Sequence, residues 1–349
     1  MFDYFTKTLL TWFVQHGRKN LPWQNPRTPY FVWISEVMLQ QTQVKTVIPY
    51  FIRFIHRFPE IHQLATADED EVLAHWSGLG YYSRARHLHQ TAKLVVNKYD
   101  GHLPNELNQL MTLPGIGAST AAAIASLAFN QPTAILDGNV KRVLSRYFLV
   151  EGNPSSASVK NQLWTLATQC MPRENCSNYT QAIMDFGALC CTKHHPSCEI
   201  CPLQPSCKAY QYQLVNQLPH KPAKKIRETK QTQWILLHHK KENFFLEKQP
   251  PHGIWGGLWC MPSISMDACP KAYLYQSLKL TVNTPIPLLQ FKHSFTHFHL
   301  TIKAVAVEAP YLELTHCPPQ QGQWFHIEQL QSIGIPKPLT KVLDCFLSL

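Results

Sequence analysis

Two acidic residues lie where acid–base chemistry would require them. The first, Glu36, lies within the apolar stretch 30–42, which reads Tyr-Phe-Val-Trp-Ile-Ser-Glu-Val-Met-Leu-Gln-Gln-Thr. Thr28 and Pro29 precede this stretch as a helix cap and a first helical residue, so the stretch is predicted to be helical. Glu36 is then either a solvated edge residue or held in a pocket. In a pocket, desolvation would raise its pKa, as a general acid requires.

The second acid, Asp137, follows the apolar pair Ile135–Leu136 and precedes a basic amphipathic run that begins at Val140. Its plain interpretation is an ordinary N-cap of the next helix. Capping and chemistry are compatible here, because backbone donors and the helix dipole would keep this carboxylate ionised. An ionised carboxylate that is fixed in place can stabilise a developing cation.

A short glycine-containing segment, Leu113–Gly117, separates two predicted helices, the second of which starts near Ser119. Gly115 and Gly117 allow close backbone approach, and the loop amides with the following helix N-terminus can hold a phosphate without reading base sequence. The alternative is a plain helix–helix turn. A second glycine-rich stretch, 78–86, contains two tyrosines and two arginines that suit a base stack and phosphates, or simply a loop and a core helix.

Four cysteines, Cys191, Cys198, Cys201 and Cys207, follow a C-x6-C-x2-C-x5-C spacing. Four thiols within one short loop predict a metal centre. Zinc usually takes two C-x2-C-like pairs and only one is present, so an iron–sulfur cluster held by Cys₄ is the better match. Cys190 adjoins the first of the four and could compete for its role.

The overall composition fits a nucleic-acid partner. The 349 residues suggest about two domains, and the formal net charge of +10 favours a polyanion. No apolar run approaches the ~18–20 residues that span a bilayer, and no signal peptide is evident, so we expect a cytoplasmic protein, in a bacterial cell acting at the nucleoid. The 11 cysteines then indicate metal ligands or free thiols rather than disulfides.

Taken together, these residues resemble the helix–hairpin–helix DNA glycosylases that carry a [4Fe–4S] cluster. The segment Ser35–Thr42 and the sequence Gly80-Tyr81-Tyr82-Ser83-Arg84 narrow the resemblance to the MutY family of adenine DNA glycosylases. The match covers about residues 1–215. A weaker resemblance, carried by the segment Trp255–Pro262, relates the C-terminal part to the Nudix-like domain of that family.

The resemblance implies a multidomain chain: an all-α helix–hairpin–helix glycosylase domain with an iron–sulfur loop, followed by an α+β Nudix-like domain. Residues 1–215 would form the first domain, with a six-helix part at about 21–133 and an iron–sulfur part made of 1–20 plus 134–215. Residues 216–231 form a basic Pro/Lys linker. The hydrophobic period then changes to 2, which predicts strands in the domain 232–349.

The resemblance also implies the reaction and its partners. The family hydrolyses the N-glycosidic bond of adenine mispaired with 8-oxoguanine or guanine in duplex DNA, which is base excision repair. We expect a monomer with no membrane partner, and with other repair proteins as possible contacts. Between Ile264 and Asn283 the only acid is Asp267, so the glutamate cluster of a working Nudix hydrolase is absent from this sequence.

By motif position, Glu36 corresponds to the acid that protonates adenine N7 and Asp137 to the residue that stabilises the sugar cation, with Asn139 supporting it. The residues implied to contact DNA or its bases are Trp23, Gln41, Tyr81, Gly115, Gly117, Ser119, Thr296 and His297. Two departures matter. Thr296 stands where the family has Ser, and Ser119 stands where related strand-cutting enzymes carry a catalytic lysine, which predicts a monofunctional enzyme.

Two rival functions fit parts of the sequence. A glycosylase/lyase for oxidised pyrimidines would share the helical domain, but Ser119 and the added C-terminal domain oppose it. An iron–sulfur DNA-binding or redox-sensing protein with an inactive site would share the cysteines. The presence of both Glu36 and Asp137 opposes that interpretation.

Overall fold

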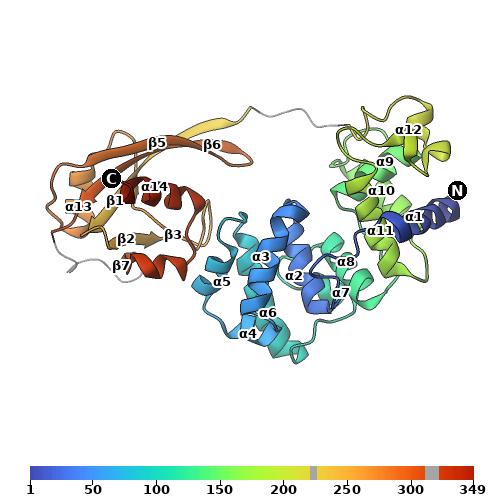
Figure 1. Ribbon diagram of the computed structural model, residues 1–349, viewed down its shortest axis with the longest axis horizontal. Coiled ribbons are helices and arrows are strands. Elements are labelled where there is room, and N and C mark those ends of the chain that lie inside the picture. The colour runs from blue at the N-terminus through green and yellow to red at the C-terminus, as the bar shows by residue number, and fades with distance from the viewer. Residues whose placement is uncertain (221–225, 311–321) are drawn as a thin grey trace. The chain divides into compact units, whose positions relative to one another are not determined.

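The computed structural model describes residues 1–220, 226–310 and 322–349, so part of the predicted basic linker lies outside the described residues. The chain divides into two compact units: Met1–Ala65 with Gln90–Lys224, and Thr66–His89 with Lys225–Leu349. Figure 1 shows the first unit as helices and the second as a sheet with helices. The domain limits remain a prediction. Residues 66–89, which fall in the predicted first domain, belong to the compact unit that contains the sheet. Within the described ranges, no helix is long and apolar enough to cross a membrane.

The first unit is helical because its apolar residues recur at helical spacing. In α1, for example, Phe5, Leu9 and Phe13 are buried. Its helices are α1 (Phe2–His16), α2 (Pro29–Leu39), α3 (Val44–Arg57), α4 (Ile61–Thr66), α6 (Ser83–Tyr99), α7 (Leu107–Met111), α8 (Ala118–Phe129), α9 (Gly138–Phe148), α10 (Ala157–Cys170), α11 (Cys176–Leu189) and α12 (Lys208–Gln211), with the short 3₁₀ turns η1 (Cys198–Ile200) and η2 (Gln204–Ser206). The last residue of α4 and the first seven residues of α6 belong to the second unit. Helix α11 packs against α1, α8 and α9.

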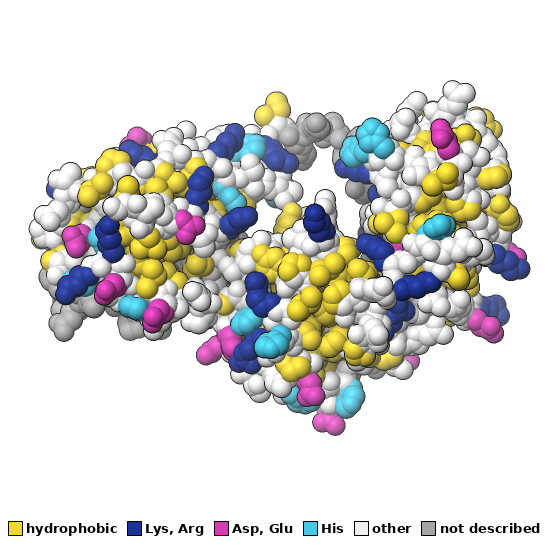
Figure 2. Space-filling model, in the orientation of Figure 1, with side chains coloured by type: hydrophobic (Ala, Val, Ile, Leu, Met, Phe, Trp, Pro, Cys, Tyr) yellow, Lys and Arg dark blue, Asp and Glu magenta, His cyan; other side chains and the backbone are white. Residues whose placement is uncertain are grey.

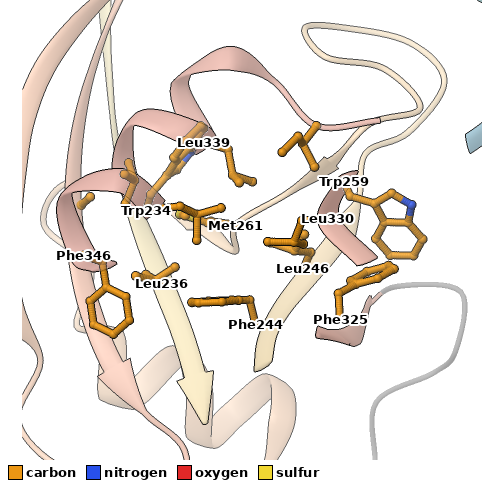
Figure 3. Packing of buried hydrophobic residues seen from close by; sticks show 14 of the residues in the cluster. Trp234, Leu236, Phe244, Leu246, Trp259, Met261, Phe325, Leu330, Leu339 and Phe346 are labelled. Atoms are coloured by element: carbon orange, nitrogen blue, oxygen red, sulfur yellow. The ribbon is translucent and has the colours of Figure 1, made fainter. Parts of the chain in front are cut away.

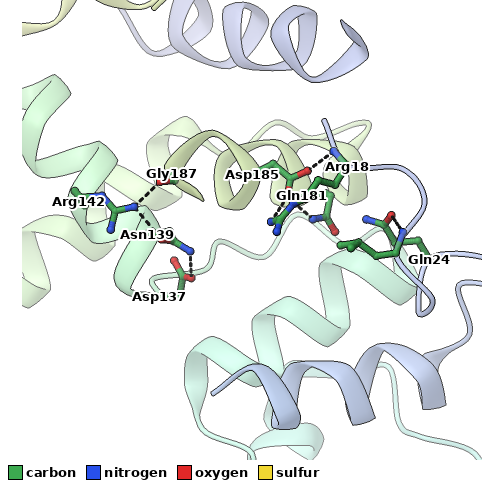
Figure 4. A network of polar contacts seen from close by, with 9 residues as sticks. Arg18, Gln24, Asp137, Asn139, Arg142, Gln181, Asp185 and Gly187 are labelled. Carbon is green, nitrogen blue, oxygen red and sulfur yellow. Dashed lines mark hydrogen bonds and ion pairs between the residues drawn. The ribbon is translucent and has the colours of Figure 1, made fainter. Parts of the chain in front are cut away.

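A buried acid in α11 ties the segment after α1 to this helical core. Asp185 is fully buried and accepts hydrogen bonds from the Arg18 backbone N–H (2.7 Å), the Arg18 Nε (2.9 Å) and the Gln181 Nε2 (2.9 Å). Figure 4 shows this cluster. Arg18 and Gln181 also line the cavity that holds Glu36 and Asp137, described below. The contact therefore positions part of the candidate site.

Replacing Asp185 by Ala should destabilise the protein by about 3 kcal/mol, because it leaves the half-buried Arg18 guanidinium without its anion. Urea unfolding measures this. The matched control is Asp3→Ala, since Asp3 pairs with Lys7 in full exposure, where an ion pair contributes less than about 1 kcal/mol. Equal effects of the two substitutions would contradict the importance of the buried pair.

The second unit is built around a mixed sheet. Its elements are the helix α5 (Glu69–Trp76), the strands β1 (Glu228–His239), β2 (Asn243–Lys248), β3 (Trp259–Cys260), β4 (Ser263–Ile264), β5 (Ile286–Ser294), β6 (Phe298–Glu308) and β7 (Gly322–His326), the helix α13 (Pro270–Leu278), the 3₁₀ turn η3 (Ile327–Gln331) and the helix α14 (Lys337–Leu347). The strand order is β3-β2-β1-β6-β5, with β4 on β1 and β7 on β2. Strands β1 and β6 are parallel, with Thr232 opposite Ile302, and the other pairs are antiparallel.

Both faces of this sheet are buried, so β1 is buried continuously from Gln233 to His238 rather than at every second residue. Trp234 and Leu236 of β1 lie on one face, where α14 contributes Leu339 and Phe346 (Figure 3). Ile235 and Leu237 lie on the other face with Leu274 and Leu278 of α13. Alternate residues of one strand therefore enter two different hydrophobic cores.

Polar contacts hold residues 66–89 to the sheet. The Asp70 carboxylate of α5 accepts hydrogen bonds from Lys248 Nζ (2.8 Å) and from Trp259 Nε1 (3.1 Å), and the Ser77 hydroxyl donates to the Ile335 carbonyl (2.7 Å). Asp70 belongs to an acidic run, 68–71, that sequence alone assigns to a solvated helix start. These contacts account for the grouping of this segment with the C-terminal residues.

Candidate active site

Glu36 lies in α2, which starts as predicted: the Thr28 hydroxyl accepts a hydrogen bond from the Phe31 N–H (3.1 Å) and Pro29 is the first helical residue. The helix is buried on most sides, including Val32 and Trp33. The Glu36 side chain lines a cavity of about 780 Å³ and, among the described residues, its carboxyl has no hydrogen-bond partner. Burial first, and then the charge of Asp137, raise the pKa of Glu36 to about 7. The pocketed alternative is therefore the one that the structure supports.

Asp137 lines the same cavity as the N-cap of α9, and its carboxylate accepts a hydrogen bond from the Val140 N–H (2.7 Å). Burial is the largest effect and raises the pKa of Asp137 above its ordinary value, although hydrogen bonds from Val140 and Asn139 and the charge of Arg142 oppose this rise. The sequence-based expectation considered only the effects that favour ionisation, and burial opposes them. Because Glu36 lacks comparable donors, Asp137 should lose its proton first.

A polar chain fixes Asp137 from behind. Asn139 Nδ2 donates to Asp137 Oδ2 (3.3 Å), and Arg142 donates to Asn139 Oδ1 (2.9 Å) and, through Nε, to the Cys191 carbonyl (2.8 Å). Figure 4 shows Arg142 between Asn139 and the Gly187 carbonyl. A Cβ atom at Gly187 would lie 2.7 Å from the Asn139 Cβ, so glycine allows α11 to approach α9 closely at this point.

The cavity collects six of the residues singled out from the sequence: Trp23, Glu36, Gln41, Ser119, Asp137 and Asn139. The Ser119 hydroxyl accepts a hydrogen bond from the Leu136 N–H (3.2 Å), and Gln40 donates to the Thr120 hydroxyl (3.1 Å). These contacts join α2, α8 and the segment before Asp137 around one space. Two carboxyl groups, a buried indole and several amides can surround a flat polar molecule there.

Sequence reasoning missed other residues at this cavity, notably Arg18, Gln40, Arg142 and Gln181. Arg142 carried a usable signal, because it lies three residues after Asn139 and so on the same helix face. Arg18 and Gln181 carried none, since they reach the cavity through tertiary contacts.

The predicted hairpin lies between α7 and α8 but is not part of the cavity lining. Gly115 has φ +76°, a conformation that favours glycine, and Gly117 caps α8 with open space around its missing Cβ. The Ile116 N–H donates to the Leu113 carbonyl (3.1 Å). This hydrogen bond closes the turn. No side chain caps the first N–H groups of α8, so these groups are available to bind an anion.

In the second unit the structure joins two of the predicted base contacts. The Tyr81 and Thr296 hydroxyls are 2.8 Å apart, although 215 residues separate them in sequence. Tyr81 has φ +51° and is 43% exposed, and Thr296 and His297 are exposed at the turn between β5 and β6. Both hydroxyls therefore belong to one polar surface.

The four predicted metal ligands, Cys191, Cys198, Cys201 and Cys207, line one small cavity together with Cys190. Arg146 of α9 donates to the Cys191 sulfur (3.4 Å), and the Cys207 thiol donates to the Arg146 carbonyl (3.7 Å). Within the described ranges, no three or more His, Cys, Asp or Glu side chains lie close enough together to hold a single metal ion. The donor set nevertheless suits the predicted centre, because all of its donors are thiols and a cation lies beside them.

Known proteins match both units. Residues 34–169 match the model of the HhH-GPD superfamily of base excision DNA repair proteins, and residues 233–345 match that of the NUDIX domain. The adenine DNA glycosylase of Buchnera aphidicola subsp. Acyrthosiphon pisum is 38% identical, over 98% of this chain and 97% of that protein. That of Mus musculus is 33% identical, over 98% and 78%. The structure of a thermostable thymine-DNA glycosylase is 29% identical with a TM-score of 0.54, over 60% of this chain and 97% of that one.

These matches confirm the predicted fold class, a helix–hairpin–helix domain followed by a Nudix-like α+β domain, and the predicted enzyme class, a DNA glycosylase. DNA is accordingly its partner. With full-length relatives above 30% identity, the chain belongs to the adenine DNA glycosylase family.

Proposed function

We propose that this glycosylase removes adenine from A:8-oxoguanine and A:G mispairs in duplex DNA as a monomer, and leaves an abasic site. The observation that carries the proposal is the pair of unlike carboxyls on one cavity: Glu36 without hydrogen-bond donors and with a pKa near 7, and Asp137 supported by donors. The net charge of +10 suits the phosphate backbone. Lys and Arg side chains appear on both units on the face drawn in Figure 2.

In this proposal the adenine leaves the base stack and enters the cavity beside Trp23, at a cost of a few kcal/mol. Neutral adenine departs poorly as an anion, so protonated Glu36 donates a proton to its ring nitrogen. The sugar then resembles an oxocarbenium ion, which the Asp137 carboxylate stabilises, and water completes the hydrolysis. Asn139 and Arg142 position Asp137.

Ser119 supports a monofunctional enzyme. Its hydroxyl accepts the Leu136 N–H hydrogen bond at the cavity wall. A serine cannot form the Schiff base with the sugar that strand cleavage by β-elimination requires. The product would therefore be an intact strand with an abasic site.

Residues that take no part in the chemical step would recognise the mispair. Gln41, on the cavity wall, and Tyr81 would contact the base left opposite, and Thr296 and His297 would contact 8-oxoguanine. The threonine hydroxyl replaces the serine hydroxyl of the family, and its contact with Tyr81 (2.8 Å) supports a joint role. Gly115 and Gly117 would hold the DNA backbone.

Cys191, Cys198, Cys201 and Cys207 would hold a [4Fe–4S] cluster. When bound, the cluster would cross-link the loop 191–207 rather than act on the base. Lys193, His194 and His195 lie within this loop, and Lys208 follows it. They would then face DNA phosphates, as a group of cations and hydrogen-bond donors.

Single-turnover excision on A:8-oxoguanine, A:G and A:T duplexes tests the proposal. We expect rapid excision from the first two, much slower excision from A:T, and strand breaks only after alkali, because Ser119 supplies no amine. An A:T rate equal to that of the mispairs would contradict the specificity. Borohydride trapping of a covalent DNA adduct would contradict the monofunctional mechanism, and an inert protein would favour the inactive-site alternative.

A further inference from the structure

Five thiols, rather than four, surround the cysteine-lined cavity. Cys190 lies on its wall beside Cys191, Cys198, Cys201 and Cys207, and only 6% of Cys190 is exposed. Cys190 and Cys201 line this cavity together. The side chain of Cys190 is thus directed at the other thiols and not into the hydrophobic interior alone.

The backbone at the end of α11 explains how consecutive residues reach one cavity. In a continuing helix they would point about 100° apart. Here the N–H groups of Cys190 and Cys191 both donate to the Phe186 carbonyl (3.0 and 2.8 Å), which ends the helix in a tight turn. The Ser197 N–H donates back to the Cys190 carbonyl (3.0 Å), and the Cys190 thiol points at the Ser197 carbonyl (4.0 Å). Cys190 is therefore held next to Cys198.

The two neighbouring thiols differ in what they contact. The Cys191 sulfur accepts a hydrogen bond from Arg146, whose guanidinium also donates to the Thr192 carbonyl (2.7 Å). These two contacts of Arg146 hold the Cys191 sulfur in place at the cavity and make Cys191 the first ligand. Among the described residues, no cation donates a hydrogen bond to the Cys190 sulfur, but Cys190 lines the same cavity as the four predicted ligands. Cys190 could therefore serve as a ligand in place of Cys191.

We propose that Cys190 is a reserve ligand, which takes the place of Cys191 when the Cys191 sulfur is lost. The exchange needs no oxidant or reductant: the Cys190 thiol releases its proton to water and its sulfur binds the vacated iron. The inference rests on the proposed [4Fe–4S] cluster. It concerns only which sulfur holds the loop, and not the chemistry at Glu36.

Iron and acid-labile sulfide per full-length chain, with the visible absorption spectrum, test this inference. Cys191→Ser should retain iron and sulfide close to the amounts of the unaltered protein, with a shifted spectrum, because Cys190 takes over as the ligand. Cys190→Ala should be unchanged. The double variant Cys190→Ala/Cys191→Ser should lose several-fold more iron and sulfide than Cys191→Ser.

Three results would overturn the inference. If Cys191→Ser and the double variant retain equal amounts of iron and sulfide, Cys190 plays no part. Loss of iron and sulfide from the single variant Cys191→Ser would show the same, because Cys190 would have failed to replace Cys191. Cys191→Ala with its own Cys190→Ala double variant repeats the comparison without a serine oxygen, and circular dichroism and anaerobic reconstitution separate cluster loss from misfolding. Absence of iron and sulfide in the unaltered protein would overturn the cluster itself.

Discussion

Replacing Glu36 by Gln should lower the single-turnover rate of adenine excision by about 10²–10⁴-fold, the usual contribution of a general acid. Gln fills the same volume and lacks only the transferable proton. The measurement is excision from an A:8-oxoguanine duplex at saturating enzyme. Glu60→Gln, at an exposed position, is the matched control and should leave the rate unchanged.

The pH dependence of the same rate provides a sharper readout. With its pKa raised to about 7, Glu36 is protonated below that pH, so the rate should fall as the pH rises above about 7. This alkaline limb should be absent in Glu36→Gln. A near-normal rate, or an unaltered alkaline limb, in the variant would remove Glu36 from the role of acid.

The melting temperature of Glu36→Gln shows whether a lost rate reflects lost chemistry or a misfolded protein. A carboxyl whose pKa is higher in the folded than in the unfolded protein costs stability wherever the folded form must ionise it. For Glu36 the cost is absent below its ordinary pKa, develops between that value and about 7, and is complete above. Glu36→Gln removes this cost, so its melting temperature at alkaline pH should not be lower than that of the unaltered protein.

Whether the sequence predicts a feature of this site depends on how far apart in the sequence the contacting residues lie. The cap at Thr28, the N-cap role of Asp137 and the strand β1 are local features, because each depends on neighbours within a few residues. They were predicted correctly. The convergence of Glu36 and Asp137 on one cavity joins residues about a hundred positions apart, and only the family resemblance implied it.

The contacts that could not be predicted are long-range and involve ordinary polar residues. Asp70 appeared to be one acid in a solvated helix start, yet it binds Lys248 and Trp259 of the C-terminal half. Asp185 carried no motif and is the fully buried partner of Arg18. In both cases the partner is set by tertiary packing, which leaves no periodic pattern in the sequence.

The burial of Asp137 is a further example with a chemical consequence. The residues around it indicate donors and a helix dipole, which favour the carboxylate, but they do not reveal desolvation in the cavity, which opposes it. The hydrogen bonds from Val140 and Asn139 and the charge of Arg142 are thus needed to keep Asp137 ionised beside Glu36. The polar chain behind Asp137 is part of the active-site electrostatics and not only of the fold.

Asp137→Asn should lower single-turnover excision by about 10²–10³-fold, the usual effect of removing one preorganised electrostatic contact to a developing charge. Asn caps helices about as well as Asp, so α9 should retain its N-cap hydrogen bond and the fold. Asp68→Asn is the matched control. Asp68 also stands at a helix N-cap, in α5, but contributes no side-chain capping bond and is not part of the cavity lining.

The same substitution should also alter the titration of Glu36. The Asp137 charge contributes to the raised pKa of Glu36, after burial, so its removal should move the alkaline limb of the residual rate to lower pH. A structural role alone would reduce the amount of active enzyme without moving this limb. An unshifted limb with a reduced rate would therefore show that Asp137 acts through the fold, whereas a normal rate would show that the sugar cation does not depend on it.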